Sequence, residues 1–259
     1  MTADFLALET VSVRLSGRAI VQDLSVSLPR GCLAALVGPN GAGKTTLLKA
    51  IAGLLPFEGS VRVDGRSVSE MPIRERATRL SYLPQGHVVY WPLPVRDVVA
   101  LGRYPHGATD PARLGERDAS AVIRAMADAD VTAFADRRVT DLSGGERSRV
   151  ALARALAVEA PIVLADEPIA SLDPRHQLDV MRLLRRVADA GTLVVVVTHD
   201  LGLTARFADR VLVLSGGRLA AHGTPQEALT DLVLAEVFKI GAYRARVGEA
   251  EIIVPWSEA

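Results

Sequence analysis

A glycine-rich segment near the N-terminus contains the residue types that phosphate chemistry requires. Residues 38–45 match G-x-x-x-x-G-K-[S/T] at every fixed position, after an apolar run and before a plausible helix, residues 46–52. Glycines allow positive φ and close backbone approach, and N–H groups at a helix start bind phosphate oxygens. The motif predicts a nucleotide site. It comprises Gly38, Pro39, Asn40, Gly41, Ala42, Gly43, Lys44, Thr45 and Thr46.

The lysine of this segment is an unusual cation for the chain. Only Lys44, Lys49 and Lys239 are lysines, and every other member of the 30 Lys+Arg residues is arginine. A compact ammonium fits a tight phosphate loop, whereas a planar guanidinium does not. We therefore expect Lys44 to reach the β- and γ-phosphates of ATP and Thr45 to give its hydroxyl to Mg²⁺.

Two adjacent carboxylates follow a second apolar run, residues 162–165. Asp166 is suited to hold Mg²⁺ through water, and Glu167 to polarise the water that attacks the γ-phosphate. Solvated acids at the end of a strand are the alternative. The complete phosphate loop earlier in the chain favours the catalytic interpretation.

The elements that must position these residues follow an α/β pattern. Residues 33–37, 162–165 and 193–197 are short apolar runs typical of buried parallel strands. Each run is followed directly by residues of the types that bind or react with nucleotides. They are Gly38 after the first run, Asp166 after the second, and Thr198 and His199 after the third. Because open α/β sheets bind ligands at the carboxyl ends of their strands, the three ends predict one site in a P-loop NTPase core with a mostly parallel sheet.

The remaining segments predict two smaller parts of one domain that spans residues 1–259. Residues 94–160 have helical spacing without a convincing strand, and predict a helical subdomain inserted in the α/β core. The first 30 residues and residues 60–63 predict a small antiparallel sheet. The tail, residues 240–259, contains two strand-like runs around Gly248.

Composition limits the class of protein. The 259 residues are 49% hydrophobic, and 30 basic residues balance 30 acidic ones, which disfavours a nucleic-acid partner. The single cysteine, Cys32, suits a reducing compartment and is expected to be a small buried hydrophobe. We find no signal peptide, and the longest dense apolar run, residues 193–197, is far below the roughly 20 residues of a membrane span. We expect a soluble chain whose membrane association depends on a partner.

Residues 142–146, Leu-Ser-Gly-Gly-Glu, resemble the signature sequence of ABC ATPases and precede an expected helix, residues 147–158. Ser143 and the N–H groups of the helix start form a second anion site. In this family, the signature of one subunit closes on the ATP held by the phosphate loop of the other. The resemblance thus implies the ABC ATPase fold, ATP and Mg²⁺ as ligands, and a head-to-tail dimer of two copies.

Other motifs resemble the same family in the same order. Gln85 matches the glutamine that senses Mg²⁺ and faces the membrane subunits, Asp173 the D-loop at the dimer interface, and His199 the histidine that contacts the γ-phosphate. The resemblance implies three sets of site residues. They are Lys44, Gln85, Glu167 and His199 for catalysis, Thr45, Gln85 and Asp166 for the metal, and Ser143, Gly144, Gly145 and Asp173 beside the phosphate loop for the nucleotide. One departure is Leu15, where the family usually has an aromatic residue against adenine.

Three further segments resemble the ATPases of iron–siderophore, haem and cobalamin importers: residues 98–106, 173–177 and 252–255. For residues 98–106, the alternative is a generic surface helix and loop. The resemblance implies an ATPase that powers a metal-chelate importer, with iron–siderophore favoured. It implies separate permease subunits, an external substrate-binding protein, and a peripheral position on the cytoplasmic face of the inner membrane.

Three alternatives remain at this point. The chain could energise transport of another substrate class, or be a soluble ABC ATPase of DNA repair or translation. The absence of heptads between Lys44 and Ser143, the single ATPase unit and the neutral charge oppose the second. A non-catalytic ATP-binding module is the third, and the intact residues Asp166, Glu167 and His199 oppose it.

Overall fold

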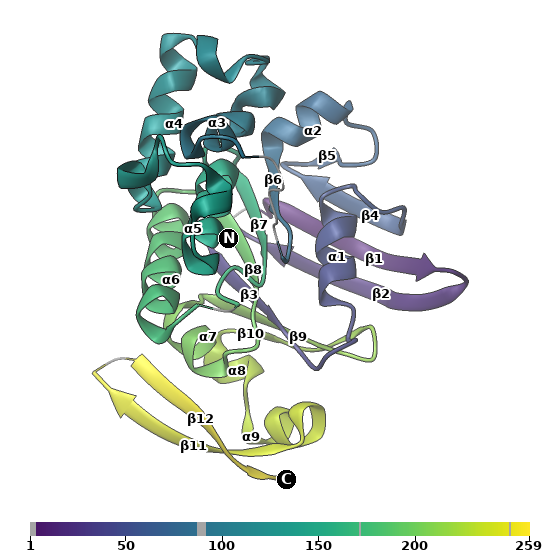
Figure 1. The fold of residues 1–259 in the computed structure, drawn as a ribbon. Helices are drawn as coiled ribbons and strands as arrows, with labels where there is room; N and C mark the ends of the chain where they lie inside the picture. Colours follow the sequence, from purple (N-terminus) through teal and green to yellow (C-terminus); the bar gives the residue numbers. More distant parts are fainter. Residues whose placement is uncertain (1–3, 87–91, 171, 249) are drawn as a thin grey trace. The chain divides into compact units, whose positions relative to one another are not determined.

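The structure is a computed structural model, and it describes residues 4–86, 92–170, 172–248 and 250–259 (Figure 1). The chain forms two compact units. The first unit comprises Met1–Met71 with Arg185–Ala259, and the second comprises Pro72–Leu184.

An antiparallel sheet in the first unit confirms the prediction made for the N-terminal region. Its strands are β1 (Leu6–Leu15), β2 (Arg18–Leu28), β4 (Glu58–Val63) and β5 (Arg66–Ser67), in the order β2-β1-β4-β5. One face of this sheet is apolar and buried, as β1 shows with four buried side chains. They are Leu6, Leu8, Val11 and Val13.

The parallel strands of the first unit position the phosphate loop. Strand β3 (Leu33–Val37) is buried throughout and lies parallel to β8 (Leu193–Val197) and β9 (Arg210–Ser215). Strand β10 (Arg218–Gly223) pairs with β9 in the antiparallel sense. The predicted runs 33–37 and 193–197 are therefore strands with those bounds. Cys32 precedes β3 and is buried, as expected, and burial raises the pKa of its thiol to about 11.

Shorter elements complete the first unit. Helix α1 (Lys44–Ile51) follows the phosphate loop, and α7 (Leu201–Phe207) follows β8. The others are α8 (Pro225–Ala228), α9 (Asp231–Val233) and the π-helical turn η5 (Leu234–Phe238).

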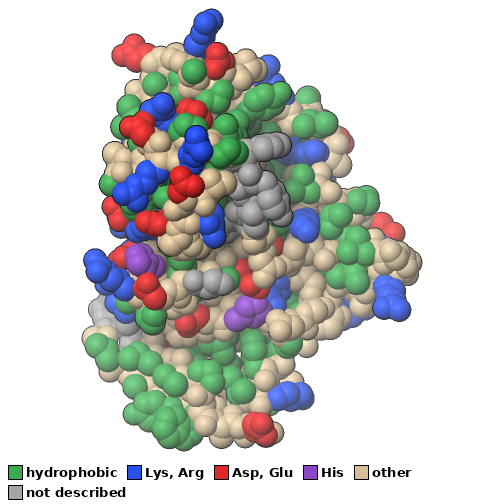
Figure 2. All heavy atoms as spheres, viewed as in Figure 1, with side chains coloured by type: hydrophobic (Ala, Val, Ile, Leu, Met, Phe, Trp, Pro, Cys, Tyr) green, Lys and Arg blue, Asp and Glu red, His purple; other side chains and the backbone are tan. Residues whose placement is uncertain are grey.

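The tail forms a β-hairpin of β11 (Ile240–Val247) and β12 (Ala250–Glu258), longer than the two predicted runs. One face packs on α7. Ile253 of β12 is buried, and a Cβ added to Gly202 of α7 would lie 3.2 Å from the Ile253 carbonyl oxygen. Tyr243 and Trp256 on the other face are exposed and contact each other, and hydrophobic side chains gather over the hairpin in Figure 2.

The second unit contains a pair of parallel strands and most of the helices. Strands β6 (Leu80–Leu83) and β7 (Ile162–Asp166) pair in parallel, and α5 (Gly144–Leu156) packs near β6. The remaining helices are α2 (Ile73–Arg79), α3 (Val95–Ala100), η1 (Leu101–His106), η2 (Pro111–Arg113), α4 (Glu116–Asp128), η3 (Thr132–Phe134) and η4 (Val139–Asp141). Helix α6 (Pro174–Asp189) belongs in part to each unit.

Two sequence-based expectations differ from the structure. The helices predicted to begin at Thr46 and Arg147 begin at Lys44 and Gly144, because the first turn of α1 is polar and that of α5 contains two glycines, and neither shows apolar spacing. The generic-surface interpretation of residues 98–106 is also wrong in part. Val98, Val99 and Arg103 are buried.

Candidate nucleotide-binding and hydrolysis site

The phosphate loop joins the buried strand β3 to helix α1. Gly38 has φ 149°, and a Cβ at this position would lie 2.2 Å from the Leu214 carbonyl oxygen of β9. Gly43, the N-cap of α1, has φ 100°, and its Cβ would lie 2.9 Å from the Ile20 carbonyl oxygen. Only glycine fits both places, so the loop packs against the strands beneath it and turns directly into the helix.

Lys44 lies inside this loop. The residue is 6% exposed, and its Nζ donates to the carbonyl oxygens of Gly38 (2.7 Å) and Pro39 (2.9 Å). These bonds hold the ammonium against the backbone that is expected to surround the phosphates. Thr45 and Thr46 follow in the first turn of α1, and both are partly exposed. Asn40 and Gly41 at the tip are exposed, and a Cβ on Gly41 would meet open space.

His199 leaves the sheet beside the loop. Strands β3 and β8 are parallel neighbours with Leu36 opposite Val197, so Gly38 and His199 follow adjacent strand ends. The turn is fixed by Thr198, whose Oγ1 accepts from the Asp200 N–H (3.1 Å), and by Asp200, which caps α7 by accepting from the Leu203 N–H (2.7 Å). His199 itself is exposed at this edge.

The carboxylates and Gln85 lie together in the second unit. Strands β6 and β7 are parallel neighbours with Leu83 opposite Ala165, so Gln85 and Glu167 follow adjacent strand ends. The Gln85 amide Nε2 donates to Glu167 Oε2 at 2.6 Å. The structure thus brings together two residues that are far apart in the sequence and that were both predicted to be catalytic, Gln85 through Mg²⁺ and Glu167 through the attacking water.

Asp166 is 1% exposed at the end of β7. Its Oδ2 accepts from the Tyr82 hydroxyl at 3.3 Å. Burial, and then the negative charge of Asp166, raise the pKa of Tyr82, so the phenol remains a protonated donor. We did not select Tyr82 from the sequence. Its position on β6, three residues before Gln85, is the signal that could have identified it once β6 and β7 were known to pair.

Glu167 has a strained backbone. Its φ is 52°, in the left-handed region, and Pro168 follows. This conformation costs an L-residue about 1–2 kcal/mol, and such outliers concentrate at functional sites.

The signature segment caps helix α5. Ser143 Oγ accepts from the Glu146 N–H (3.3 Å), and Glu146 Oε2 accepts from the Ser143 N–H (2.7 Å). These bonds, led by the one from the Ser143 backbone, lower the pKa of Glu146. Ser143 and Gly144 are exposed, whereas a Cβ on Gly145 would lie 3.3 Å from Leu172 Cδ2. The helix start is therefore preformed, and its first residues lie at the surface.

The D-loop-like segment, residues 170–173, leads into α6. Asp173 accepts from the His176 N–H (3.0 Å) and contacts its Nδ1 (2.6 Å), and the backbone bond chiefly lowers the pKa of Asp173. Ser171 lies outside the described residues. Leu15, where an adenine-stacking aromatic is usual in the family, is at the end of β1 and is 37% exposed, so it offers an aliphatic surface.

A glycine loop between a buried parallel strand and a helix, closed over a buried lysine, defines a P-loop nucleotide-binding protein. The sequence matches the family described as ABC transporter over residues 21–170. The chain belongs to this family and is an ATP-binding, ATP-hydrolysing domain of it.

Individual relatives are more specific. The hemin import ATP-binding protein HmuV of Streptomyces coelicolor is 50% identical over 87% of this chain and 80% of its own length. The proteins of the same name from Rhodococcus jostii (46%; 90% and 79% covered) and Rhizobium meliloti (42%; 88% and 88%) are also similar. A metal-chelate type ABC transporter solved in an inward-facing conformation has a TM-score of 0.83 at 27% identity, with 98% of both chains covered.

None of the helices in the described ranges combines the length and apolarity needed to cross a bilayer. Among the same residues, no group of three or more His, Cys, Asp or Glu side chains is arranged to hold a metal ion.

Proposed function

We propose that this chain is the ATP-hydrolysing subunit of an importer that carries hemin or a closely related iron chelate. The similarity to proteins named for hemin import, up to 50% identity over 87% of the chain, carries the proposal. The match to a metal-chelate type transporter across 98% of the chain supports it. Hemin is therefore favoured over the iron–siderophores preferred on sequence alone.

In this proposal the phosphate loop holds ATP. The N–H groups of residues 38–45 and the Lys44 ammonium bind the β- and γ-phosphates. The Thr45 hydroxyl and the Asp166 carboxylate are oxygen donors of the kind that Mg²⁺ prefers, so the residues fit this ion. Bound Mg²⁺ supplies positive charge against the phosphate oxygens. Asp166 is buried and stays oriented by the Tyr82 hydroxyl.

Hydrolysis is assigned to Glu167, Gln85 and His199. Glu167 accepts a hydrogen bond from the attacking water, and the 2.6 Å bond from Gln85 fixes the orientation of its carboxylate. His199, at the exposed edge beside the phosphate loop, contacts the γ-phosphate. Catalysis then consists of positioning and charge stabilisation.

The proposed working unit contains two copies of the chain. Ser143, Gly144, Gly145 and Asp173 of one copy face the ATP of the other. The exposed, capped start of α5 supports this role, because its N–H groups are an anion site on the surface. Separate permease subunits, in turn served by an external substrate-binding protein, place the pair at the cytoplasmic face of the inner membrane.

Isolation and reconstitution test the function. The tagged chain is isolated from its native membranes in mild detergent, and the proteins that accompany it are identified by mass spectrometry. The complex is then placed in liposomes with ATP and Mg²⁺, and uptake of hemin is measured against uptake of an iron–siderophore. A complex that contains the Glu167→Gln variant is the control that tests whether uptake requires ATP hydrolysis.

We expect a polytopic permease in the complex, and hemin uptake that requires ATP and fails with Glu167→Gln. Uptake of the iron–siderophore and not of hemin would instead assign the importer to the other iron chelates. Isolation with ribosomal or repair proteins and no permease would refute the transport function and leave the ATPase in place.

A further inference from the structure

Among the fully buried residues that the structure describes, Arg103 of η1 has the largest side chain. The residue is 0% exposed, and its side chain is 1% exposed. Arginine is almost never fully buried unless it is paired, because burial of an isolated charge is costly. The candidate nucleotide site does not include this residue, so its burial calls for a separate explanation.

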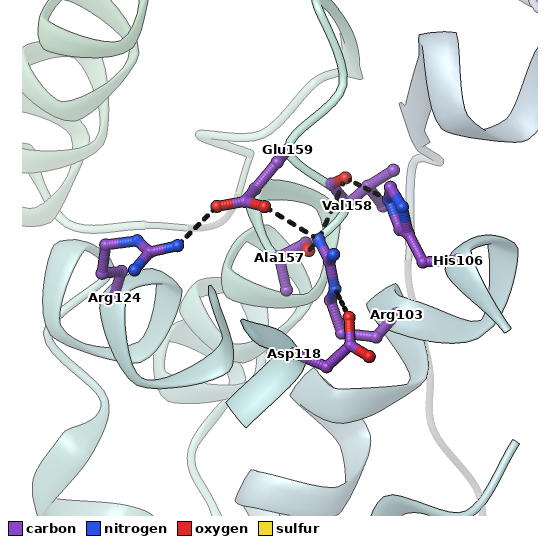
Figure 3. Close-up of polar contacts among 7 residues, drawn as sticks. All are labelled: Arg103, His106, Asp118, Arg124, Ala157, Val158 and Glu159. Atoms are coloured by element: carbon purple, nitrogen blue, oxygen red, sulfur yellow. Dashed lines mark hydrogen bonds and ion pairs between the residues drawn. The ribbon is translucent and has the colours of Figure 1, made fainter. Parts of the chain in front are cut away.

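The partners of Arg103 come from two other helical segments (Figure 3). Its Nε donates to Asp118 Oδ1 in the first turn of α4 at 2.8 Å. Its Nη1 donates to the carbonyl oxygen of Ala157 at 2.7 Å and to Glu159 Oε2 at 3.1 Å. The guanidinium therefore joins the start of α4 to the segment that ends α5.

The contacted carbonyl groups are those that a helix end leaves without intrahelical partners. Ala157 is the C-cap of α5, and the next carbonyl, of Val158, accepts from Arg103 Nη1 (3.3 Å) and contacts His106 Nε2 (2.8 Å). A cation here also interacts favourably with the helix dipole. Arg103 and His106, both in η1, thus cap α5 from outside.

The backbone beside Arg103 is fitted to the same helix end. A Cβ on Gly102 would lie 2.3 Å from the Arg154 carbonyl oxygen and 3.0 Å from Ala157 Cβ. Glycine lets η1 touch the last turn of α5, and the arginine then reaches past it to the helix end. Gly102 and Arg103 together therefore hold the C-terminal end of α5.

Arg103 also holds the turn that leads into strand β7, which ends at Asp166. Glu159 has φ 55° between α5 and β7, and it is bonded by Arg103 and by Arg124 of α4 (2.7 Å). Burial opposes ionisation of Glu159, but the bond from Arg124 and the charge of Arg103 outweigh it and lower its pKa. Glu159 is consequently a carboxylate in the folded protein, with a fixed position.

We propose that Arg103 is a positioning residue for the signature helix: it fixes the C-terminal end of α5 so that Ser143, at the other end, meets the ATP of a second copy. This inference rests on the proposed dimeric ATPase function.

The geometry explains why one end of the helix controls the other. Helix α5 has 13 residues, so it is about 20 Å long at a rise of about 1.5 Å per residue. A tilt of a few degrees about a loosened C-terminal end displaces the N-terminal end by about 1–2 Å. A misplacement of about 1 Å in a catalytic assembly can lower the rate about a hundredfold.

The test compares Arg103→Met, Arg103→Lys and a matched control, Arg124→Met, with the wild-type chain. Arg124 belongs to the same cluster but its side chain is 59% exposed, and it reaches Glu159 from α4. Four quantities are measured: the thermal midpoint, the affinity for a fluorescent ATP analogue, kcat with KM for ATP, and ATP-dependent dimerisation in a Glu167→Gln background. Rates are expressed per molecule that binds the analogue, so that unfolded protein does not count.

For Arg103→Met we expect ATP-analogue affinity within about twofold of wild type, kcat lower by about tenfold or more, and dimerisation that needs about tenfold more ATP. Arg103→Lys retains the charge and should recover part of both losses. Arg124→Met should stay within about twofold throughout.

A lower thermal midpoint with normal kcat and normal dimerisation per binding-competent molecule would overturn the proposal and leave Arg103 a structural residue only. Equal loss in Arg124→Met would also overturn it. Absence of hydrolysis in the wild-type chain would instead refute the proposed function, so the two failures are distinguishable.

Discussion

At the residue scale, short hydrogen bonds hold the side chains of the candidate site in place. The Gln85 amide lies 2.6 Å from Glu167 Oε2, and the Lys44 ammonium lies 2.7 Å from the Gly38 carbonyl oxygen. Both contacts restrict side chains that would otherwise sample several rotamers. A carboxylate and an ammonium that are already oriented lose less entropy when they meet the transition state.

The first prediction concerns Glu167→Gln. The amide keeps the shape of the side chain but cannot accept the water proton, so hydrolysis should fall by about 10²-fold or more. ATP binding should remain, because the phosphate loop is unchanged, and an ATP-bound dimer should accumulate. Phosphate release and size-exclusion chromatography with ATP measure the two effects. A variant that hydrolyses ATP at the wild-type rate would remove Glu167 from its assigned role.

A second prediction concerns Cys32. Burial raises the pKa of the thiol to about 11, above its ordinary value of 9.0, so very little thiolate exists at pH 8. An alkylating reagent at pH 8 should leave the native protein unmodified and should modify it rapidly in denaturant. Mass spectrometry after timed quenching measures this. Rapid native modification would mean that the segment before β3 opens frequently.

The sequence indicates the candidate site residues more directly than it indicates the residues that surround them. Lys44 and Glu167 follow from a motif and a strand end, since their chemistry demands particular residue types. Tyr82 and Arg103 could not be predicted, because their partners Asp166 and Glu159 are brought near only by the pairing of β6 with β7 and by helix packing. The positive φ of Glu167 likewise has no sequence signal, since such a conformation is imposed by the surrounding structure.

At the scale of elements, the phosphate loop depends on two glycines in different ways. Gly38 is enclosed by β9, whereas Gly41 is at an exposed tip with φ 78°. Gly38→Ala would force a methyl group into the Leu214 carbonyl oxygen and should destabilise the fold by about 3 kcal/mol. Gly41→Ala should cost about 1 kcal/mol and should weaken ATP binding about tenfold through the distorted loop.

The thermal midpoint and the affinity for a fluorescent ATP analogue distinguish the effects of the two substitutions. Gly38→Ala should show the larger loss of thermal midpoint, and Gly41→Ala a normal fold with weaker binding. If both variants lost stability equally, the close approach of Gly38 to β9 would not exist in solution.

The tail hairpin gives a matched pair of positions on its two faces. Ile253 is 1% exposed against α7, and Trp256 is 78% exposed. Ile253→Ala should lower the free energy of unfolding by about 2–4 kcal/mol, and Trp256→Ala by less than about 1 kcal/mol. Urea unfolding measures both. Equal effects would show that the hairpin does not pack on α7 through this face.

Element types were easier to predict than their limits. The runs 33–37 and 193–197 are strands with those bounds because all their residues are buried, which leaves a continuous apolar signal. The hairpin extends beyond its predicted runs, since β12 continues through Pro255 and exposed polar residues to Glu258. The starts of α1 and α5 were missed for the related reason that a capping turn carries no apolar periodicity.

For the whole molecule, folding and nucleotide binding must be linked, because ATP binds the folded chain. With ATP at about 100 times its dissociation constant, the gain in stability is about 2.7 kcal/mol. For a chain of 259 residues this corresponds to a rise in the thermal midpoint of about 5–10 °C. Lys44→Ala should lose most of this rise, since the ammonium lies in the loop that receives the phosphates.

Removal of Mg²⁺ separates binding from turnover in the same experiment. With EDTA, ATP should still raise the wild-type midpoint, by a smaller amount, while phosphate release stops, because the charge on the phosphate oxygens is no longer neutralised. Restored Mg²⁺ should recover both the full rise and the release of phosphate. A full rise with Mg²⁺ but no phosphate release, even with the permease present, would mean that the intact set Lys44, Asp166 and Glu167 serves binding alone. A wild-type midpoint that ATP leaves unchanged would contradict the phosphate loop itself, since a ligand that prefers the folded chain must stabilise it.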